Sequence, residues 1–286
     1  MEAVAHHRFL RSTHIVRLLS HRAPRKIIDR LTLLYHAGLL DRPRAQLDQF
    51  NSPGSAPIVY ALGNNGADVL AGLGHDFSPD IEWTDKNRDA KRPYIEHALR
   101  TADLMIPLRI AVRDDDEIQM LDARALRPSL PGPARSSSSP WTLNARVKVR
   151  GSHVAIATIP DAVFALHFKD AGKRAYFFVE ADRATMPVDR SDLTQSSFRR
   201  KLLAYLAIQT ERQHSERLGF ANLRVLTVTA GQERIASMLA SLDDITAGRG
   251  SGMFLFTDVD TLAHDDPLTL PWITSHGNMR LDFPPR

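Results

Sequence analysis

The sequence contains no cysteine. This absence excludes disulfides, thiolate metal centres such as zinc ribbons and iron–sulfur clusters, and cysteine nucleophiles. The sequence also lacks any apolar run approaching the ~18–20 residues that a membrane-spanning helix needs. The N-terminus does not show the basic, apolar and small-residue pattern of a secretory signal. We therefore expect a cytoplasmic protein that does not bind membranes.

The length and composition suit a globular protein. The 286 residues are 43% hydrophobic and 24% charged, which fits one large or two modest domains. The element pattern predicts an N-terminal domain over residues 1–73, a polar connector over 74–92 and a larger domain over 93–286. Within the larger domain, the stretch 126–141 is rich in proline and serine and is predicted to be a flexible loop.

Positive charge is concentrated near the N-terminus. Residues 1–47 carry nine Lys and Arg against three Asp and Glu, a net charge of +6, whereas the rest of the chain is close to neutral. A basic end on a near-neutral body indicates a polyanionic partner, most simply double-stranded DNA. The alternative is a solvated basic surface with no partner.

The same region shows helical signals followed by a hairpin. A short helix is predicted from Ser12 and a longer one from Pro24, because proline suits a first helical turn. Strands are predicted at 39–41 and 57–62, around a long tip over 42–56. Helices followed by a hairpin are typical of a winged-helix domain, in which the third helix enters the major groove of DNA.

Five basic residues are the candidate DNA contacts of this domain: Arg25, Lys26, Arg30, Arg42 and Arg44. Arg25 and Lys26 fall in the first turn of the longer helix, where cations oppose the helix dipole. This unfavourable placement of two cations is explained if their side chains face DNA. Arg30 continues the exposed face, and Arg42 and Arg44 are predicted on the wing. The alternative is a helical scaffold that contacts proteins.

The larger domain alternates helices and strands. Helices are predicted at 94–112, 191–217 and 232–245, and strands at 117–123, 144–149, 161–168, 174–182, 223–229 and 253–258. This order predicts an α/β sandwich, α+β over the whole chain, with a central mixed sheet.

One predicted hairpin brings three carboxylates together. A two-residue turn within 170–173 places Asp161 opposite Asp182 and Glu180 one diagonal step away, all on one face. Partly desolvated acids at this spacing repel, and at least one should have a raised pKa. A Mg²⁺ or Mn²⁺ ion held by Asp161 and Glu180 would offset the repulsion. The alternative is a pair of exposed strand ends whose solvated acids have an arginine partner, for which Arg183 is the candidate.

Lys201 follows on the next predicted helix, beside its apolar stripe. The side chain of Lys201 can lean over the sheet end towards the acids and serve as a catalytic cation. The alternative is an ordinary lysine on the helix surface.

Several motifs carry a resemblance to a known family. They are LTLLYHAGLLDR, YALGNNGADVL, IPDAVFAL, FFVEADRAT, KLLAY and MFLFTDVDTL. Together they resemble the replication-relaxation family of plasmid and mobile-element proteins. The resemblance implies a winged-helix domain joined to a domain of the PD-(D/E)xK nuclease type, with roles in plasmid replication, DNA relaxation and mobilisation. It makes Asp161 and Glu180 the motif acids, whereas Asp182 stands where the motif has lysine.

Two main hypotheses for function follow. In the first, a DNA-binding protein of a plasmid or mobile element nicks or cleaves DNA with Mg²⁺. Asp161 and Glu180 hold the metal, Asp182 is a further ligand or orients water, and Lys201 offsets transition-state charge. In the second, a non-catalytic regulator or relaxosome accessory factor binds DNA and replication or relaxosome proteins. A homodimer is a further expectation, and a structural dimerisation module is a third reading.

Overall fold

The computed structural model describes residues 1–49, 56–75, 81–149, 152–190, 192 and 195–285. These residues form two compact units, Met1–Ile106 and Pro107–Arg286. Parts of the predicted wing tip and of the predicted connector, residues 50–55 and 76–80, lie outside the described residues. Within the described ranges, no helix is both long enough and apolar enough to cross a membrane.

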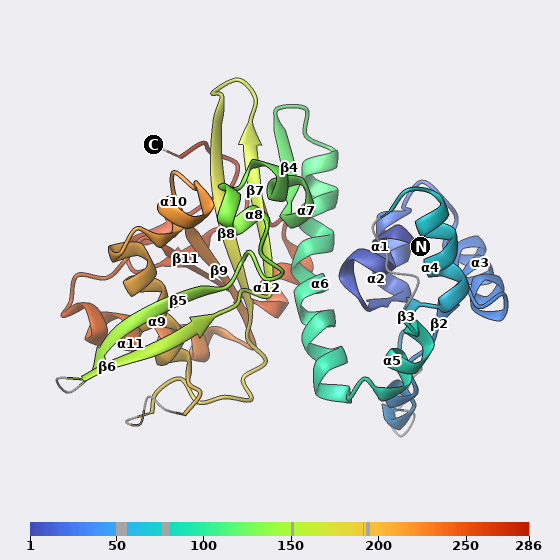
Figure 1. Cartoon of the computed structure of the whole chain (residues 1–286), viewed down its shortest axis with the longest axis horizontal. Coiled ribbons are helices and arrows are strands. Elements are labelled where there is room, and N and C mark those ends of the chain that lie inside the picture. Colours follow the sequence, from blue (N-terminus) through green and yellow to red (C-terminus); the bar gives the residue numbers. More distant parts are fainter. Residues whose placement is uncertain (50–55, 76–80, 150–151, 191, 193–194, 286) are drawn as a thin grey trace. The chain divides into compact units, whose positions relative to one another are not determined.

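The first unit combines short helices with a small antiparallel sheet (Figure 1). Its elements are α1 (Glu2–His7), β1 (Leu10–Arg11), α2 (Ser12–Leu18), α3 (Pro24–His36), β2 (Leu40–Asp41), the 3-10 helix η1 (Arg44–Gln49), β3 (Val59–Leu62), α4 (Asn64–Gly72) and α5 (Trp83–Asp89). The strand order is β1-β3-β2, with both pairs antiparallel. The predicted hairpin strands are thus present, whereas β1 was not predicted.

Three glycines allow the chain to cross itself closely after α3. Gly38 follows the end of α3 and has a φ of +67°, a left-handed conformation that favours glycine just after a helix. A Cβ on Gly63 would lie 2.2 Å from the carbonyl oxygen of Gly38, and one on Gly66 would lie 2.0 Å from that of Leu39. Any side chain at Gly63 or Gly66 would therefore push β3 and α4 away from the end of α3.

The predicted connector differs from the structure. Its described part contains α5, whose Asn87 is fully buried and donates to Asp41 Oδ2 at 3.0 Å and to the Leu62 carbonyl at 2.9 Å. Helix α6 (Arg92–Arg113) then adds Ile95 and Leu99 to a buried cluster. The first unit consequently extends to Ile106 rather than ending at residue 73.

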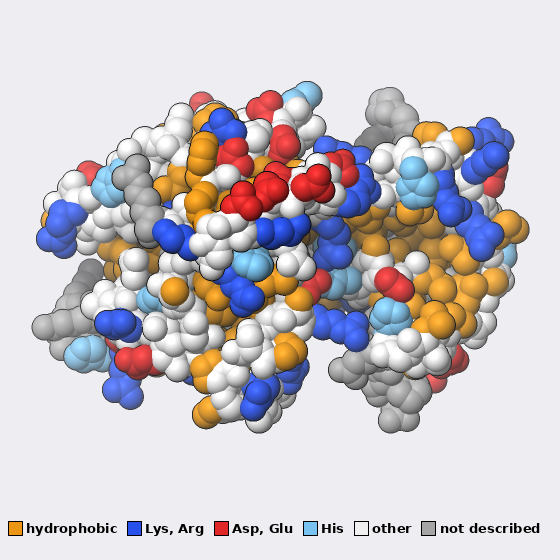
Figure 2. Space-filling model, turned by 90° about the horizontal axis from the view of Figure 1, so that it is seen from above, with side chains coloured by type: hydrophobic (Ala, Val, Ile, Leu, Met, Phe, Trp, Pro, Cys, Tyr) orange, Lys and Arg blue, Asp and Glu red, His pale blue; other side chains and the backbone are white. Residues whose placement is uncertain are grey.

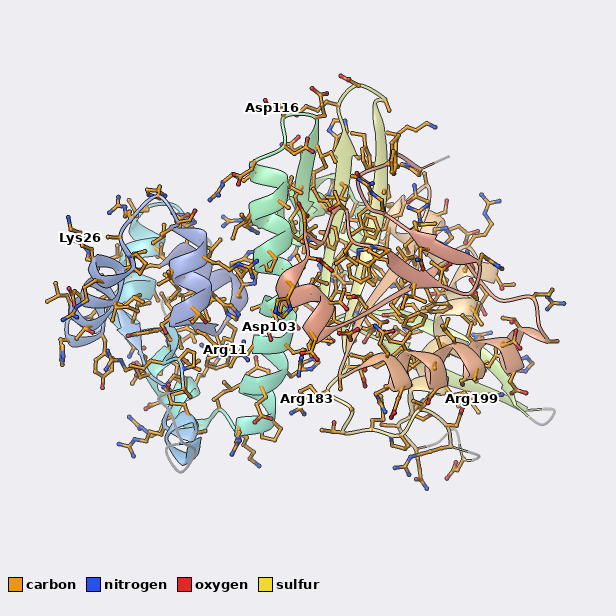
Figure 3. All side chains as sticks on the ribbon, turned by 180° about the vertical axis from the view of Figure 1, so that it is seen from behind. Arg11, Lys26, Asp103, Asp116, Arg183 and Arg199 are labelled. Carbon is orange, nitrogen blue, oxygen red and sulfur yellow. The ribbon has the colours of Figure 1, made fainter. Side chains whose placement is uncertain are left out.

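A partly buried polar network ties α6 to the start of the chain within the first unit. His14 Nε2 lies 2.8 Å from Asp103 Oδ1, and Arg11 also bonds that oxygen. Figure 3 shows Arg11 and Asp103 next to each other. The predicted helix from Ser12 is thereby fixed to a helix about ninety residues away along the chain, a contact that no local pattern encodes.

The second unit is built on a seven-stranded mixed sheet (Figure 1). Its strands are β4 (Ile118–Asp122), β7 (Ala162–Phe168), β8 (Lys173–Ala181), β9 (Arg224–Thr229), β10 (Phe254–Asp258), β11 (Trp272–Thr274) and β12 (Gly277–Met279). The order is β12-β11-β10-β9-β8-β7-β4, with β9 parallel to β8 and to β10 and all other pairs antiparallel. The predicted mixed α/β fold is confirmed.

Both faces of this sheet are apolar. On one face, Phe178 and Val225 pack with Leu202 of α9 (Phe198–Thr210) and Met238 of α11 (Gln232–Thr246). On the other face, Phe164 and its partner Phe177 stack with ring centroids 4.9 Å apart. The β7–β8 hairpin is thus a central strand pair.

Three predictions in this unit differ from the structure. The stretch 126–141 carries η2 (Arg127–Ser129) and α8 (Gly132–Arg135), and its Leu126, Leu130 and Ala134 are buried in the main core. It is therefore packed rather than a free loop, because apolar residues recur between its prolines.

The predicted strand 144–149 does not join the main sheet. It belongs to β5 (Leu143–Val149), which pairs with β6 (Ser152–Thr158) in a separate two-stranded sheet. The predicted helix 191–217 is two helices, α9 and α10 (Gln213–Leu218), with Arg212 between them at a φ of +54°. Residues 191, 193 and 194 of that prediction lie outside the described residues. The remaining helices are α7 (Ala123–Leu126) and α12 (Val259–His264).

Candidate functional site

The predicted register of the acidic hairpin is wrong by two residues. Phe168 pairs with Lys173, so the turn has four residues rather than two, and Ala162 pairs with Val179. Continued by one residue, this register places Asp161 across from Glu180 on the neighbouring strand, and not across from Asp182. Because the shift is an even number, the acids keep the same face of the sheet.

Glu180 is the buried centre of the site. It is 1% exposed, and each carboxylate oxygen has a donor from α9: Lys201 Nζ bonds Oε2 and the Tyr205 hydroxyl bonds Oε1. Burial raises the pKa of Glu180, Lys201 opposes this effect, and the charge of Asp161 adds to it. The predicted raised pKa is thus confirmed at Glu180. Lys201 reaches the acids as predicted, because it lies one helical turn before Tyr205.

The ionisation of both α9 partners follows from this burial. Desolvation alone would lower the pKa of Lys201, but the charges of Glu180 and Asp161 outweigh it and raise the pKa. Burial and the nearby carboxylate raise the pKa of Tyr205 well above its ordinary value of 10.0. Lys201 is therefore a fixed cation, and Tyr205 is a neutral hydrogen-bond donor.

Asp161 lies beside Glu180 at the start of β7. Its backbone N–H donates to the Val179 carbonyl at 2.9 Å, and its Oδ2 accepts the backbone N–H of Ala181 at 2.7 Å. Asp161 thus brackets Glu180 from both sides along β8. This main-chain clamp keeps two carboxylates of adjacent strands together despite their mutual repulsion.

Asp182 belongs to a different network. Arg234 of α11 forms a two-pronged pair with it, Nε to Oδ2 at 2.5 Å and Nη2 to Oδ1 at 2.9 Å. The Thr229 hydroxyl also donates to Oδ2 at 2.6 Å. The predicted alternative of solvated strand-end acids with Arg183 as partner is wrong for Asp182, because this side chain is buried and its arginine partner is Arg234. No local signal identifies Arg234, which lies 52 residues away in sequence.

The carboxylate oxygens at this site are the type of ligand that a magnesium ion prefers. Mg²⁺ is commonly held by one or two carboxylates and keeps several waters, and Asp161 and Glu180 are two such groups on adjacent strands. Thr227 pairs with Glu180 across the β8–β9 ladder, is fully buried, and has no hydrogen-bond partner for its hydroxyl among the described residues. In that same part of the chain, no group of three or more His, Asp or Glu side chains is arranged for a metal. Among the described residues, the site thus offers at most two carboxylates as metal ligands.

The basic residues of the first unit do not share one surface. Arg25 is 89% exposed and pairs with Asp29 at 3.5 Å. Lys26 and Arg30 line an apolar groove of about 650 Å³ between α1, α2 and α3. Figure 2 shows hydrophobic side chains gathered over this unit with Lys and Arg at their edges. Arg42 and Arg44 lie together at a separate pocket, at the base of the hairpin.

Fold and site together define a two-unit α/β protein, with a basic helical unit and a buried acid–lysine pair in a mixed sheet. The chain belongs to the replication-relaxation family, whose model matches residues 1–223. The chain is thus a member of a replication-related family, as its motifs predict. No curated protein and no solved structure matches it. Strands β9 to β12 follow the matched region.

Proposed function

We propose that this protein is a DNA-binding replication protein of a plasmid or mobile element, and that its first unit is a winged helix that grips duplex DNA. The order α1, β1, α2, α3, β2, β3 and the sheet order β1-β3-β2 support this proposal. The cations Arg25, Lys26 and Arg30 on α3 support it further, since recognition helices present basic residues to DNA.

The test of DNA binding is a charge reversal on α3. The double variant Arg25→Glu/Lys26→Glu should bind duplex DNA at least about tenfold more weakly, with a shallower salt dependence, because bound phosphates release counterions. The matched control is Arg217→Glu/Arg249→Glu, which changes the same charge at exposed positions of the second unit. Equal loss in both variants, or binding insensitive to salt, would refute a specific role for α3.

We further propose that the second unit is a nuclease-like domain that hydrolyses a phosphodiester bond in DNA. The observation that carries this proposal is the contact of Lys201 with Glu180, beside Asp161. A nuclease site of this type needs two acids and a cation, and here the cation comes from α9, since Asp182 stands at the lysine position of the motif. Lys201 supplies the positive charge from one helical turn before Tyr205.

Each residue of the site has a distinct role in this proposal. Asp161 and Glu180 would hold Mg²⁺, which when bound supplies an activated water and stabilises phosphoryl charge. Tyr205 donates to Glu180 and fixes its orientation. Lys201 is 38% exposed, so it can reach both the buried carboxylate and a phosphate at the surface. Asp182, paired with Arg234, holds α11 against the sheet.

Plasmid nicking tests the enzyme hypothesis. Supercoiled plasmid should be nicked only with Mg²⁺ or Mn²⁺, and nicking should vanish in Asp161→Asn and fall in Lys201→Ala by about a hundredfold or more, the usual loss of one charge-stabilising group. Glu216→Gln, an exposed acid on α10, is the matched control and should nick normally. Nicking that survives Asp161→Asn would exclude this site.

One observation favours a second candidate function, a non-catalytic DNA-binding regulator or relaxosome accessory factor. Both oxygens of Glu180 and both oxygens of Asp182 already have donors within the protein. A network whose carboxylate oxygens all accept hydrogen bonds from within the protein is also typical of a purely structural core. In this case DNA binding persists, no metal-dependent nicking occurs, and replication or relaxosome proteins, or a second copy of the chain, are the partners.

A further inference from the structure

A second pocket lies in the first unit, and its lining does not include the α3 cations Arg25, Lys26 and Arg30. It has a volume of about 450 Å³, within the size range of small-ligand sites, and Tyr35, Ile58 and Pro43 contribute to its wall. Gln46 fixes this wall: its side-chain amide both donates to and accepts from the backbone of Val59, at 3.1 and 2.8 Å. The Gln46 side of the pocket is therefore tied to the backbone of β3.

Arg42 is held in this pocket by aromatic rings. Its guanidinium carbon lies 4.3 Å from the ring centre of Tyr35 and 5.2 Å from that of Tyr60, and its Nη2 donates to the Tyr60 hydroxyl at 3.1 Å. Its Nη2 also lies 3.4 Å from the Thr32 hydroxyl, and its Nε is buried without a hydrogen-bond partner among the described residues. Arg42 is thus a pre-oriented cation held by aromatic rings and hydroxyl groups.

The pocket is positively charged overall. Arg44 and Arg88 line it together with Arg42, against the single carboxylate of Asp41. That carboxylate is already engaged, by the backbone N–H of Arg42 at 2.7 Å and by Asn87 at 3.0 Å. Arg88 pairs with Asp85 on an exposed helix surface, a type of pair that contributes little and exchanges readily.

We propose that this pocket binds the phosphate group of a phosphorylated ligand, with Arg42, Arg44 and Arg88 as its cationic contacts. Arginine guanidinium groups match phosphate oxygens in charge and geometry. The phosphate belongs either to a DNA strand or to a free nucleotide. The pocket does not depend on DNA binding by α3, because none of its residues comes from the exposed N-terminal turns of α3.

Calorimetric titration of the full chain with inorganic pyrophosphate tests the pocket. The wild type should bind, and Arg44→Gln/Arg88→Gln should bind about tenfold more weakly or worse, the equivalent of one lost charged hydrogen bond. Both arginines are exposed, so this variant keeps the fold. Arg42→Lys retains the positive charge but loses the planar guanidinium group that matches phosphate oxygens, so this variant should also weaken binding. The control Arg17→Gln/Arg22→Gln removes the same charge elsewhere in the unit and should bind as the wild type does.

A competition arm distinguishes the two sources of the phosphate. If the phosphate is part of DNA, pyrophosphate displaces duplex DNA, and Arg44→Gln/Arg88→Gln weakens duplex binding. If it is part of a free nucleotide, duplex binding is unchanged and the variant loses only pyrophosphate binding. The proposal is overturned if the wild type does not bind pyrophosphate, or if Arg44→Gln/Arg88→Gln binds it equally well. Failure of DNA binding by α3 is a separate result, since Arg25→Glu/Lys26→Glu should still bind pyrophosphate.

Discussion

Lys201 and Glu180 form an ion pair whose two members are buried to very different extents. The Glu180 side chain is 2% exposed, whereas that of Lys201 is 38% exposed. The carboxylate is therefore sealed beneath α9, while part of the Lys201 side chain meets solvent. The lysine thus adds positive charge at the accessible side of the pair, which favours an anionic ligand there.

The burial of Glu180 predicts a pH dependence of stability. Because its folded-state pKa is raised above the ordinary value of 4.5, its contribution to the free energy of unfolding is complete below pH 4.5 and is lost as the pH rises through the folded-state pKa. Glu180→Gln cannot ionise, so its stability relative to the wild type should increase across that interval. Urea unfolding between about pH 4 and about pH 8 measures this difference. Parallel curves for the two proteins would contradict it.

A divalent cation at Asp161 and Glu180 should stabilise the fold. At a hundredfold excess over its dissociation constant, Mn²⁺ or Mg²⁺ should add ~2–3 kcal/mol and raise the melting temperature. Glu180→Gln should abolish the rise, whereas Glu216→Gln should keep it. Thermal melts with and without each metal provide the measurement. An equal rise in both variants would mean that the ion binds elsewhere.

Removing one partner of the pair between Asp182 and Arg234 should be strongly destabilising. The two side chains are 5% and 16% exposed, so Arg234→Met leaves a buried carboxylate without its partner and should cost about 3–5 kcal/mol. Adding Asp182→Asn should recover part of that loss. The control is Arg199→Met, because the Arg199 partner Asp244 is 70% exposed, and the cost should stay below about 1 kcal/mol. Figure 3 marks Arg199. Denaturant unfolding compares all three variants.

Asp103 predicts an acid sensitivity in the first unit. Burial alone would raise the pKa of Asp103, but its bonds to His14 and Arg11 outweigh burial and lower it. The stabilisation that these bonds provide is fully present when the pH is above 3.8, the ordinary pKa of an aspartate. It is lost as the pH falls through the lower pKa of Asp103 in the folded state. Asp103→Asn should destabilise the protein at neutral pH and flatten the acid limb of its unfolding profile. An unchanged acid limb would show that the network does not form in solution.

Fragments should reveal where the first unit ends. Residues 1–73 lack Asn87, Ile95, Leu99 and Asp103, which fill its core and its polar network. This fragment should be largely unfolded by circular dichroism, whereas residues 1–113, which include all of α6, should fold. A cooperative melt from residues 1–73 would restore the shorter domain that the sequence predicts.

Local patterns predicted most elements, because helix starts, strand alternation and turn glycines act over a few residues. The start of α3 at Pro24 and the positions of β7 and β8 are examples. The turn between β7 and β8 was missed because its length is set elsewhere: the backbone of Lys169 bonds the Glu117 carbonyl at 2.9 Å, next to β4. That bond keeps Lys169 aligned with β4, and the four-residue turn moves the register by two.

The candidate site was predictable only in part, for a related reason. Asp161, Glu180 and Lys201 were identifiable because strand and helix periodicity places them at one end of the sheet. Arg234 and Thr227 were not, since they come from α11 and β9, and their nearness to the acids depends on parallel strand pairing. Pairings between distant segments leave no signature in a single sequence.

The order of the sheet places the acids at a boundary within it. The family match ends at residue 223, and β9, β10, β11 and β12 form one unbroken block on one side of β8. Glu180 and the nearby Asp182 lie where β8 meets this block, and the block with its helix α11 supplies Thr229 and Arg234 to Asp182. The hydrogen bonds of Asp182 therefore depend on the pairing of β8 with β9, so this carboxylate acquires its partners only when the two parts of the sheet have come together.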